Sequence, residues 1–408
     1  MSQVKPQPAR VAGIRQGVTV VIAAFLPILA IISMFPAVPA MIQHFSADPT
    51  AHIKVPSMVS APGLTIAIVA LFMGMLVDRF GRRRLLLVST FCYGFFGALP
   101  FLLESLNAVY ASRLLLGVSE AAILTTLNTL IADYWDERGR RNWLTVQGLA
   151  GPALSSLVIY FAGTLVNWRW NAIFLMYLVG LPIFVAMWAW MYEPRGEPVA
   201  GVARNAGAGS ASSLRFPLGA VIGIGVLTLF SSALYYVFII NGGIVWQELG
   251  VTDPEQIGRV TALPSLFVLA GAILFWLQGR FGVSARGQIF SFLVMLGAGL
   301  ALIGTATSAR GMILGMAVQQ TGAGMCVPAL IAWAQKQLPF EHRGRGMGVW
   351  AACFFFGQFS SPLLVSALKG AAGTMQGAFL ASGVIGIVGA VVVWMLLSRT
   401  TAGRAASA

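Results

Sequence analysis

The chain has 408 residues, of which 58% are hydrophobic and 10% are charged, and its mean hydropathy is +0.82. Soluble globular proteins carry about 25% charged residues, so this composition excludes a soluble globular protein and indicates one surrounded by lipid. The net charge of +13 would suit nucleic acid, but the basic residues lie in short clusters between apolar segments. That pattern is typical of membrane topology, and we expect no nucleic-acid partner.

Apolar segments recur along the whole chain, and a membrane-spanning helix needs roughly 20 such residues. We predict twelve spans, at residues 17–43, 55–77, 85–103, 106–132, 143–166, 172–191, 216–246, 257–278, 288–307, 310–335, 347–368 and 373–397. The first is longer than the roughly 7–15 apolar residues of a cleaved signal peptide, so we expect it to be retained. Nearly every segment contains Gly or Pro, which membrane helices tolerate because neighbouring helices satisfy the freed backbone groups.

The distribution of Lys and Arg predicts the orientation. With the N-terminus placed in the cytoplasm, twenty of the 26 basic residues fall on the cytoplasmic side, five fall on the other side, and Arg113 lies inside a span. This is a strong positive-inside signal. We expect a multi-pass protein of a bacterial inner membrane with both termini in the cytoplasm.

Two halves are indicated by the middle of the chain and by an internal repeat. Residues 192–215 are rich in Gly, Ala, Ser and Pro, which is typical of a flexible linker. The sequence Arg-Phe-Gly at 79–81 recurs at 280–282, and Arg-Gly-Arg at 138–140 recurs at 343–345. Such repeats occur in secondary transporters. We predict six-helix bundles at 1–191 and 216–408, joined by the linker.

The loop after the second predicted span reads GMLVDRFGRRR at 74–84. It resembles the signature of the major facilitator superfamily, and the repeat at 279–286 resembles its second copy. In the fourth span, RLLLGVSE at 113–120 resembles the RxxxG motif that this family associates with proton coupling. Gly151-Pro152, followed by Ser155-Ser156, partly resembles the fifth-span motif of drug:proton antiporters, which has glycines where this chain has serines.

This resemblance implies an all-α membrane protein with twelve transmembrane helices in two pseudo-symmetric bundles. It implies a secondary transporter that works by alternating access. It also points to a cytoplasmic gate motif made of Gly74, Asp78, Arg79, Gly81, Arg82 and Arg83.

The gate motif has a physical rationale. Gly74 would let the second span approach a neighbouring helix closely, and Gly81 would permit a tight turn with positive φ. We expect the arginines at 79 and 82–84 to meet Asp133, Asp136 and Glu137 after the fourth span. Our hypothesis is that these contacts close the cytoplasmic side in one conformation and break in the other. The alternative is that the charges serve only topology.

Two ionisable residues fall near the middle of the membrane. Arg113 and Glu120 lie seven residues apart, so they share one helix face at a separation of about 10 Å. A charge within a span costs roughly 2.5–3.5 kcal/mol or more and usually faces a cavity. We expect Glu120 to carry the proton and Arg113 to tune it or to contact an anionic substrate group. The alternative is a structural polar contact between helices.

The second half offers uncharged polar and aromatic candidates for a cavity wall. We select Tyr236, Gln319 and Gln358, although helix packing or lipid contact would explain each one equally well. We find no catalytic triad, metal cluster or phosphate-binding loop, and therefore expect neither an enzyme nor a cofactor. The sequence has three cysteines, Cys92, Cys326 and Cys353, and all lie inside apolar segments. We expect them to be buried thiols.

Three functions remain open at this point. The first is proton-coupled efflux of a small, largely apolar solute. The second is proton-coupled uptake of an organic anion, aromatic or carboxylate. The third is a membrane sensor that does not transport. We expect a monomer whose partners are a small-molecule substrate, protons and the lipid bilayer.

Overall fold

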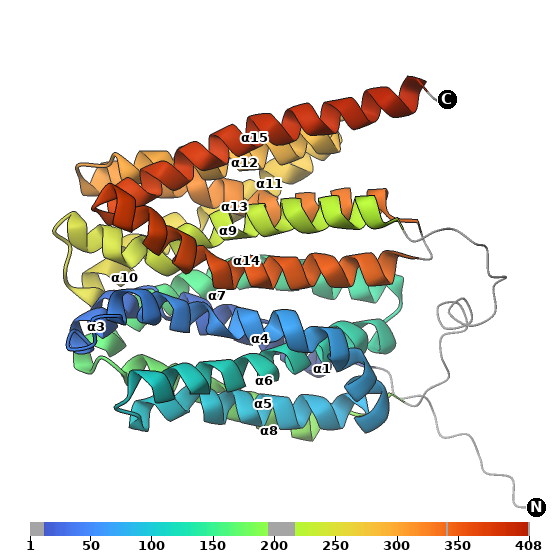
Figure 1. Ribbon diagram of the computed structural model, residues 1–408. Coiled ribbons are helices and arrows are strands. Elements are labelled where there is room, and N and C mark those ends of the chain that lie inside the picture. Colours follow the sequence, from blue (N-terminus) through green and yellow to red (C-terminus); the bar gives the residue numbers. More distant parts are fainter. Residues whose placement is uncertain (1–11, 195–216, 340–341, 407–408) are drawn as a thin grey trace, which may run out of the picture.

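The computed structural model describes residues 12–194, 217–339 and 342–406, and the regular structure in these ranges is helical (Figure 1). Twelve helical segments are long and apolar enough to cross a membrane. The predicted all-α fold with twelve spans is therefore confirmed. Several spans extend further than predicted. The fifth begins at Glu137 because the Asp136 carboxylate accepts a 2.9 Å bond from the Gly139 amide and caps the helix.

We call the described residues before the predicted linker, 12–194, the first half, and they form ten helical elements. They are α1 (Ile14–Ala24), α2 (Leu26–Ile32), α3 (Ala37–His44), α4 (Ala51–Phe80), α5 (Arg82–Ala98), the 3₁₀ turn η1 (Leu99–Leu102), α6 (Leu106–Tyr134), α7 (Glu137–Trp168), the 3₁₀ segment η2 (Ala172–Val179) and α8 (Gly180–Trp190). Helix α6 packs against both α4 and α5.

We call the described residues after the predicted linker, 217–339 and 342–406, the second half, and seven α-helices are described there. They are α9 (Leu218–Glu248), α10 (Pro254–Ser265), α11 (Phe267–Arg280), α12 (Ala285–Gly304), α13 (Ala309–Gln337), α14 (Arg343–Ala372) and α15 (Met375–Ala406). Helix α12 packs against α13 and α15, and α9 packs against α14. The proposed linker falls between α8 and α9, and its residues 195–215 lie outside the described residues.

The first span is broken into α1, α2 and α3. Pro27 lies in the first turn of α2 and Pro36 precedes α3. Proline has no N–H and clashes with the preceding turn, so the helix is interrupted at both places. The Tyr93 hydroxyl donates a 2.7 Å hydrogen bond to the Leu26 carbonyl, and the Tyr177 hydroxyl donates one of 2.6 Å to the Ala30 carbonyl. A broken helix is tolerated in lipid when neighbours satisfy its backbone in this way.

Spans of alternating direction place the chain's described ends on one side of the bundle. We call this the terminal side, because α1 begins and α15 ends there (Figure 1), and we call the opposite side the far side. On the far side the two halves touch through α7 and α10. A Cβ added to Gly163 would lie 2.2 Å from the Pro254 carbonyl oxygen, and one added to Gly258 would lie 2.6 Å from that of Ile159. The backbones of the two helices are therefore in direct contact.

A polar contact reinforces this far-side closure. The Asn167 side-chain amide of the first half donates a 2.7 Å bond to the Asp253 carboxylate, which also caps α10 by accepting bonds from the Glu255 and Gln256 amides. The Asn167 amide is the main cause that lowers the pKa of Asp253, and the two backbone amides add to it. A lowered pKa means that the contact is present above the ordinary carboxyl range and is lost only as pH falls through the lowered value.

Glycines on the terminal side and in the middle of α7 have very different surroundings. A Cβ added to Gly74 of α4, to Gly148 or Gly151 of α7, or to Gly344 of α14 would meet no atom within 4 Å. The close helix approach predicted for Gly74 is therefore not seen in this conformation. The halves meet through α7 and α10 on the far side and through α4 and α14 nearer the middle, whereas the glycines at 74 and 344 on the terminal side face open space.

Candidate functional site

A cavity of about 480 Å³ lies between the two halves. Its wall is built from α2, α4, α6 and α7 of the first half and from α9, α10, α11, α13 and α14 of the second. The lining residues include Phe35 and Phe238, whose ring centroids lie 5.2 Å apart. Toward the terminal side they reach Leu144, near the start of α7. A mainly apolar cavity of this size, with a few polar groups, fits a small organic ligand.

Glu120 supplies the acid of this cavity. It projects from α6, lines the cavity and is only 2% exposed, and its Oε1 has no hydrogen-bond partner among the described residues. A buried polar atom without a partner is unusual and calls for an explanation such as a missing ligand or proton. No Lys, Arg or His is found among the described residues that line the cavity. Nothing in the wall therefore neutralises a charge on Glu120.

Arg113 lies on the same helix but does not line the cavity. It is fully buried and donates hydrogen bonds to the Tyr177 hydroxyl and to the Ala30 carbonyl, the latter at 3.4 Å. Its guanidinium lies 4.5 Å from the centroid of the Tyr177 ring and 5.6 Å from that of Phe174. Tyr177 itself donates a 2.6 Å bond to Ala30.

Arg113 therefore anchors the interrupted first span to α6 and η2. No ion pair joins Arg113 and Glu120 among the described residues. In this conformation Arg113 is held among residues of the first half and does not line the cavity, and its contact with an anionic substrate stays a prediction.

An aromatic cluster forms the opposite wall. The ring centroids of Tyr235 and Tyr236 lie 4.8 Å apart, and Phe354 lies 6.0 and 5.8 Å from them. All three line the cavity. Tyr236 and Gln358, which the sequence singled out, are thus placed at the site.

Gln319, which the sequence also singled out for the cavity wall, does not line the cavity. It is fully buried where α13 meets α12, and a Cβ added to Gly299 would lie 2.5 Å from its Cβ. Its neighbour Gln320 lines the cavity instead. One residue along a helix changes direction by about 100°, and two adjacent glutamines in an apolar helix give no signal of which faces inward. Gln147 of α7, a lining residue that we did not select, lies four residues before Gly151 on one helix face.

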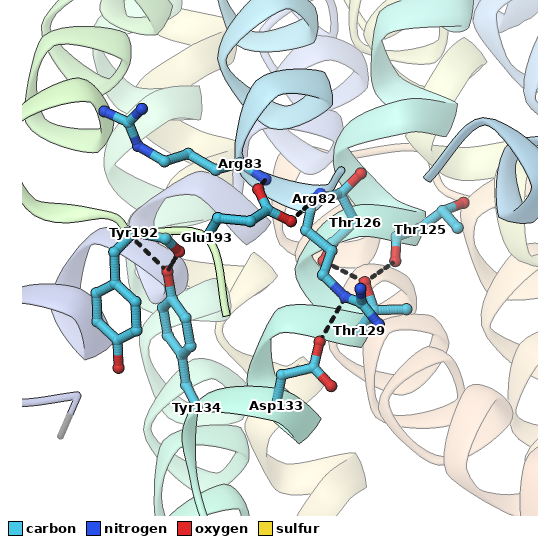
Figure 2. A network of polar contacts seen from close by, with 9 residues as sticks. All are labelled: Arg82, Arg83, Thr125, Thr126, Thr129, Asp133, Tyr134, Tyr192 and Glu193. Carbon is cyan, nitrogen blue, oxygen red and sulfur yellow. Dashed lines mark hydrogen bonds and ion pairs between the residues drawn. The ribbon is translucent and has the colours of Figure 1, made fainter. Parts of the chain in front are cut away.

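The gate motif lies on the terminal side, at the junction of α4 and α5 (Figure 2). Gly81 has φ +83°, which confirms the predicted tight turn with positive φ. Arg82 Nε lies 2.6 Å from Asp133 of α6, so one of the expected contacts with the acids after the fourth span is present. The side chain of Asp78 lies outside the described residues, and Arg79 lies over the ring of Phe80 at 5.7 Å.

Glu193 was not foreseen as part of this cluster. Its carboxylate accepts 2.7 Å bonds from the backbone amides of Arg82 and Arg83 and so caps the N-terminus of α5 (Figure 2). The Arg83 guanidinium donates to the carbonyls of Met191 and Trp188 at the end of α8. These contacts tie α5, α6 and α8 together within the first half. They lie within one half, so they do not by themselves close the terminal side.

The ion pair between Arg82 and Asp133 can be tested with a double-mutant cycle. Both side chains are about one-third exposed, so solvent screens the pair and it should contribute only about 0.2–1 kcal/mol. We expect Arg82→Ala and Asp133→Ala each to lower the thermal unfolding midpoint slightly, and the double variant to lose less than the sum. Midpoints measured on purified protein give the coupling energy. Fully additive losses would show that the pair contributes nothing.

Comparison with known proteins agrees with this architecture. A family model described as the Major Facilitator Superfamily matches residues 20–251 and 221–408. The chain belongs to the major facilitator superfamily. As a member of this superfamily with twelve spans, it is a multi-pass membrane transporter.

Several members of the superfamily are similar in sequence or structure. The 3-(3-hydroxy-phenyl)propionate transporter of Escherichia coli is 26% identical over 339 residues, which cover 81% of each chain. The multidrug efflux pump LfrA of Mycolicibacterium smegmatis is 29% identical over 153 residues, covering 37% of this chain and 29% of that protein. The D-xylose-proton symporter superposes with a TM-score of 0.74 at 15% identity, covering 93% of this chain and 96% of the other, and supports the fold alone.

Proposed function

We propose that this protein couples the inward movement of protons to the export of a small, largely apolar aromatic compound that is neutral or cationic. The observation that carries the proposal is Glu120, a buried acid with an unpartnered oxygen in a cavity that has no basic residue among its described lining. Such a carboxyl group can hold a proton or a cation, and an anion would meet no opposite charge there. Ionisable residues inside a membrane usually mark an ion or substrate path.

In this proposal the proton gradient supplies the energy, and the two halves move relative to each other to expose the cavity to either side of the membrane. In our proposal the terminal side faces the cytoplasm, as the distribution of basic residues indicates, so the cavity is open to the cytoplasm in this conformation. The halves at 1–191 and 216–408 then rock about the cavity, opening the far-side contact between α7 and α10. One chain builds the entire cavity, so a monomer in the inner membrane suffices.

Uptake of an aromatic carboxylate is the second candidate. Similarity to the 3-(3-hydroxy-phenyl)propionate transporter of Escherichia coli over 81% of both chains favours it. In this version a protonated Glu120 would accompany the anion, since two negative charges in one apolar cavity repel each other. The aromatic wall of Tyr235, Tyr236 and Phe354 suits either substrate.

Transport by purified protein in liposomes with an imposed pH gradient separates the candidates. The probes are ethidium, a cationic aromatic dye, and 3-(3-hydroxyphenyl)propionate. Export predicts that ethidium moves against the proton flux and dissipates the gradient, whereas uptake predicts that the acid moves with the protons. Liposomes without protein provide the background. Transport of either probe at the same rate with and without the pH gradient would contradict proton coupling.

A further inference from the structure

One face of α7 forms a distinct part of the cavity wall. The residues that line the cavity from this helix follow helical spacing: Leu144, Gln147, Gly148, Gly151, Pro152, Ser155 and Ile159. Most glycines of the far-side contact serve close packing, as Gly163 does. Gly148 and Gly151 do not, because a Cβ added to either would meet no atom within 4 Å. The wall beside Gln147 is therefore open space rather than a packed surface.

Gln147 places an unused hydrogen-bond acceptor in this opening. Its Oε1 is buried from solvent and has no hydrogen-bond partner among the described residues. Neighbours on the same face do not supply a donor, since Ser155 donates its hydroxyl to the Gly151 carbonyl at 2.8 Å and Leu144 has no polar side-chain atom. An amide carbonyl that is buried without a partner is unfavourable until a donor reaches it.

Gln147 and Glu120 line the same cavity at similar depths. The helical rise of 1.5 Å per residue places Glu120 about 21 Å from the end of α6 at Tyr134, and Gln147 about 15 Å from the start of α7 at Glu137. Both helix ends lie on the terminal side, so the two residues differ in depth by about 6 Å. This is the length of a benzene ring with one substituent. Both residues line the same cavity, and each carries an acceptor oxygen without a partner among the described residues.

We propose that Gln147 is a substrate-binding residue that determines specificity, and that it selects aromatic substrates carrying an N–H or O–H donor. The ring lies between the open wall at Gly148 and Gly151 and the aromatic cluster, and the donor group bonds to the Gln147 carbonyl. Selection follows from the unpartnered carbonyl. A substrate without the donor leaves it buried and unsatisfied, and a site built to bond a donor rejects analogues that lack it.

This proposal deepens the proposed function and rests on it for the location of the substrate. Two matched probe pairs test it by equilibrium binding to purified protein in lipid nanodiscs. One pair is phenethylamine and its N,N,N-trimethyl derivative. The other is 3-(3-hydroxyphenyl)propionate and its methyl ether. In each pair methylation removes the hydrogen-bond donor and keeps the ring and the net charge.

We expect wild-type protein to bind the donor-bearing member of at least one pair about tenfold more tightly than its methylated partner, as one hydrogen bond allows. Gln147→Leu should weaken binding of that member about tenfold and change its partner less than twofold. Gln320→Leu, which removes an amide from another wall of the same cavity, is the control and should affect both members alike.

Three outcomes would overturn the proposal: an unchanged preference in Gln147→Leu, equal binding of both members by wild-type protein, or no binding of any probe. Binding is measured without a proton gradient, so it is separate from coupling. If Glu120→Gln still couples protons while Gln147→Leu loses the preference, the proposed coupling role fails and the assignment of Gln147 stands.

Discussion

Glu120→Gln is expected to abolish proton-coupled transport while leaving substrate exchange across the membrane intact. Glutamine has nearly the same shape as glutamate but cannot exchange a proton, so the cavity keeps its volume and loses the acid at Glu120. Coupling between two ligands of one protein typically changes the affinity for each by about 5- to 150-fold. In Glu120→Gln this factor should fall to one, and transport should no longer respond to pH.

The measurement uses liposomes containing a pH-sensitive dye together with the ethidium and aromatic-acid probes. Wild-type protein should acidify or alkalinise the lumen as substrate moves, and Glu120→Gln should not. Counterflow of labelled against unlabelled substrate, without a gradient, should persist in the variant and shows that it is folded. Glu104→Gln is a matched control, because Glu104 is 77% exposed and makes only a long ion pair with Arg169. Proton movement that survives in Glu120→Gln would place coupling at another group.

Gly163→Leu is expected to hold the far side open and to reduce transport strongly. Even a Cβ at this position would lie 2.2 Å from the Pro254 carbonyl oxygen, and the neighbouring backbone at Glu255 is 2.7 Å away. Backbone atoms cannot move aside as a flexible side chain can, so the contact between α7 and α10 must separate. Overpacking typically costs 1–3 kcal/mol. Because the cost applies only to the conformation with the far side closed, it shifts the equilibrium about 5- to 150-fold toward the conformation with the far side open.

Spin labels at Trp168 and Gln256, placed on the two sides of this contact, report the separation. We expect a short distance in the wild-type chain and a distribution dominated by longer distances in Gly163→Leu. Gly370→Leu is the control, since Gly370 is also on the far side, at the end of α14, and a Cβ there meets no atom within 4 Å. It should keep the wild-type distance distribution and its transport. A wild-type distribution in Gly163→Leu would show that this contact does not define the closed state.

The sequence was sufficient for the parts of this protein that depend on local composition. Twelve spans follow from hydropathy, because a helix in lipid must be apolar over roughly 20 residues whatever its neighbours are. The loop at 74–84 identified the family, and Gly81 could be assigned a positive φ because only glycine adopts it without strain. Glu120 stood out for the same reason, since an acid within an apolar span is costly and rarely without a role.

Tertiary structure alone decided which side chains face the cavity. Gln319 and Gln320 differ by one position, and only the packing of α13 against α12 turns the second inward. Arg113 shares a helix face with Glu120, but its hydrogen bonds to Ala30 of the broken first span and to Tyr177 of η2 hold it behind the cavity wall. Glu193 caps α5 from a position 111 residues away along the chain.

These outcomes have one physical reason. A helix inside a bundle is apolar on its lipid side and on its protein side, so hydropathy fixes where it crosses the membrane and carries little information about its rotation. Rotation is set by contacts between distant residues, such as the approach of Gly163 to Pro254 or of Gly299 to Gln319. The sequence therefore determined the family, the spans and the acid, and the three-dimensional packing determined the cavity around that acid.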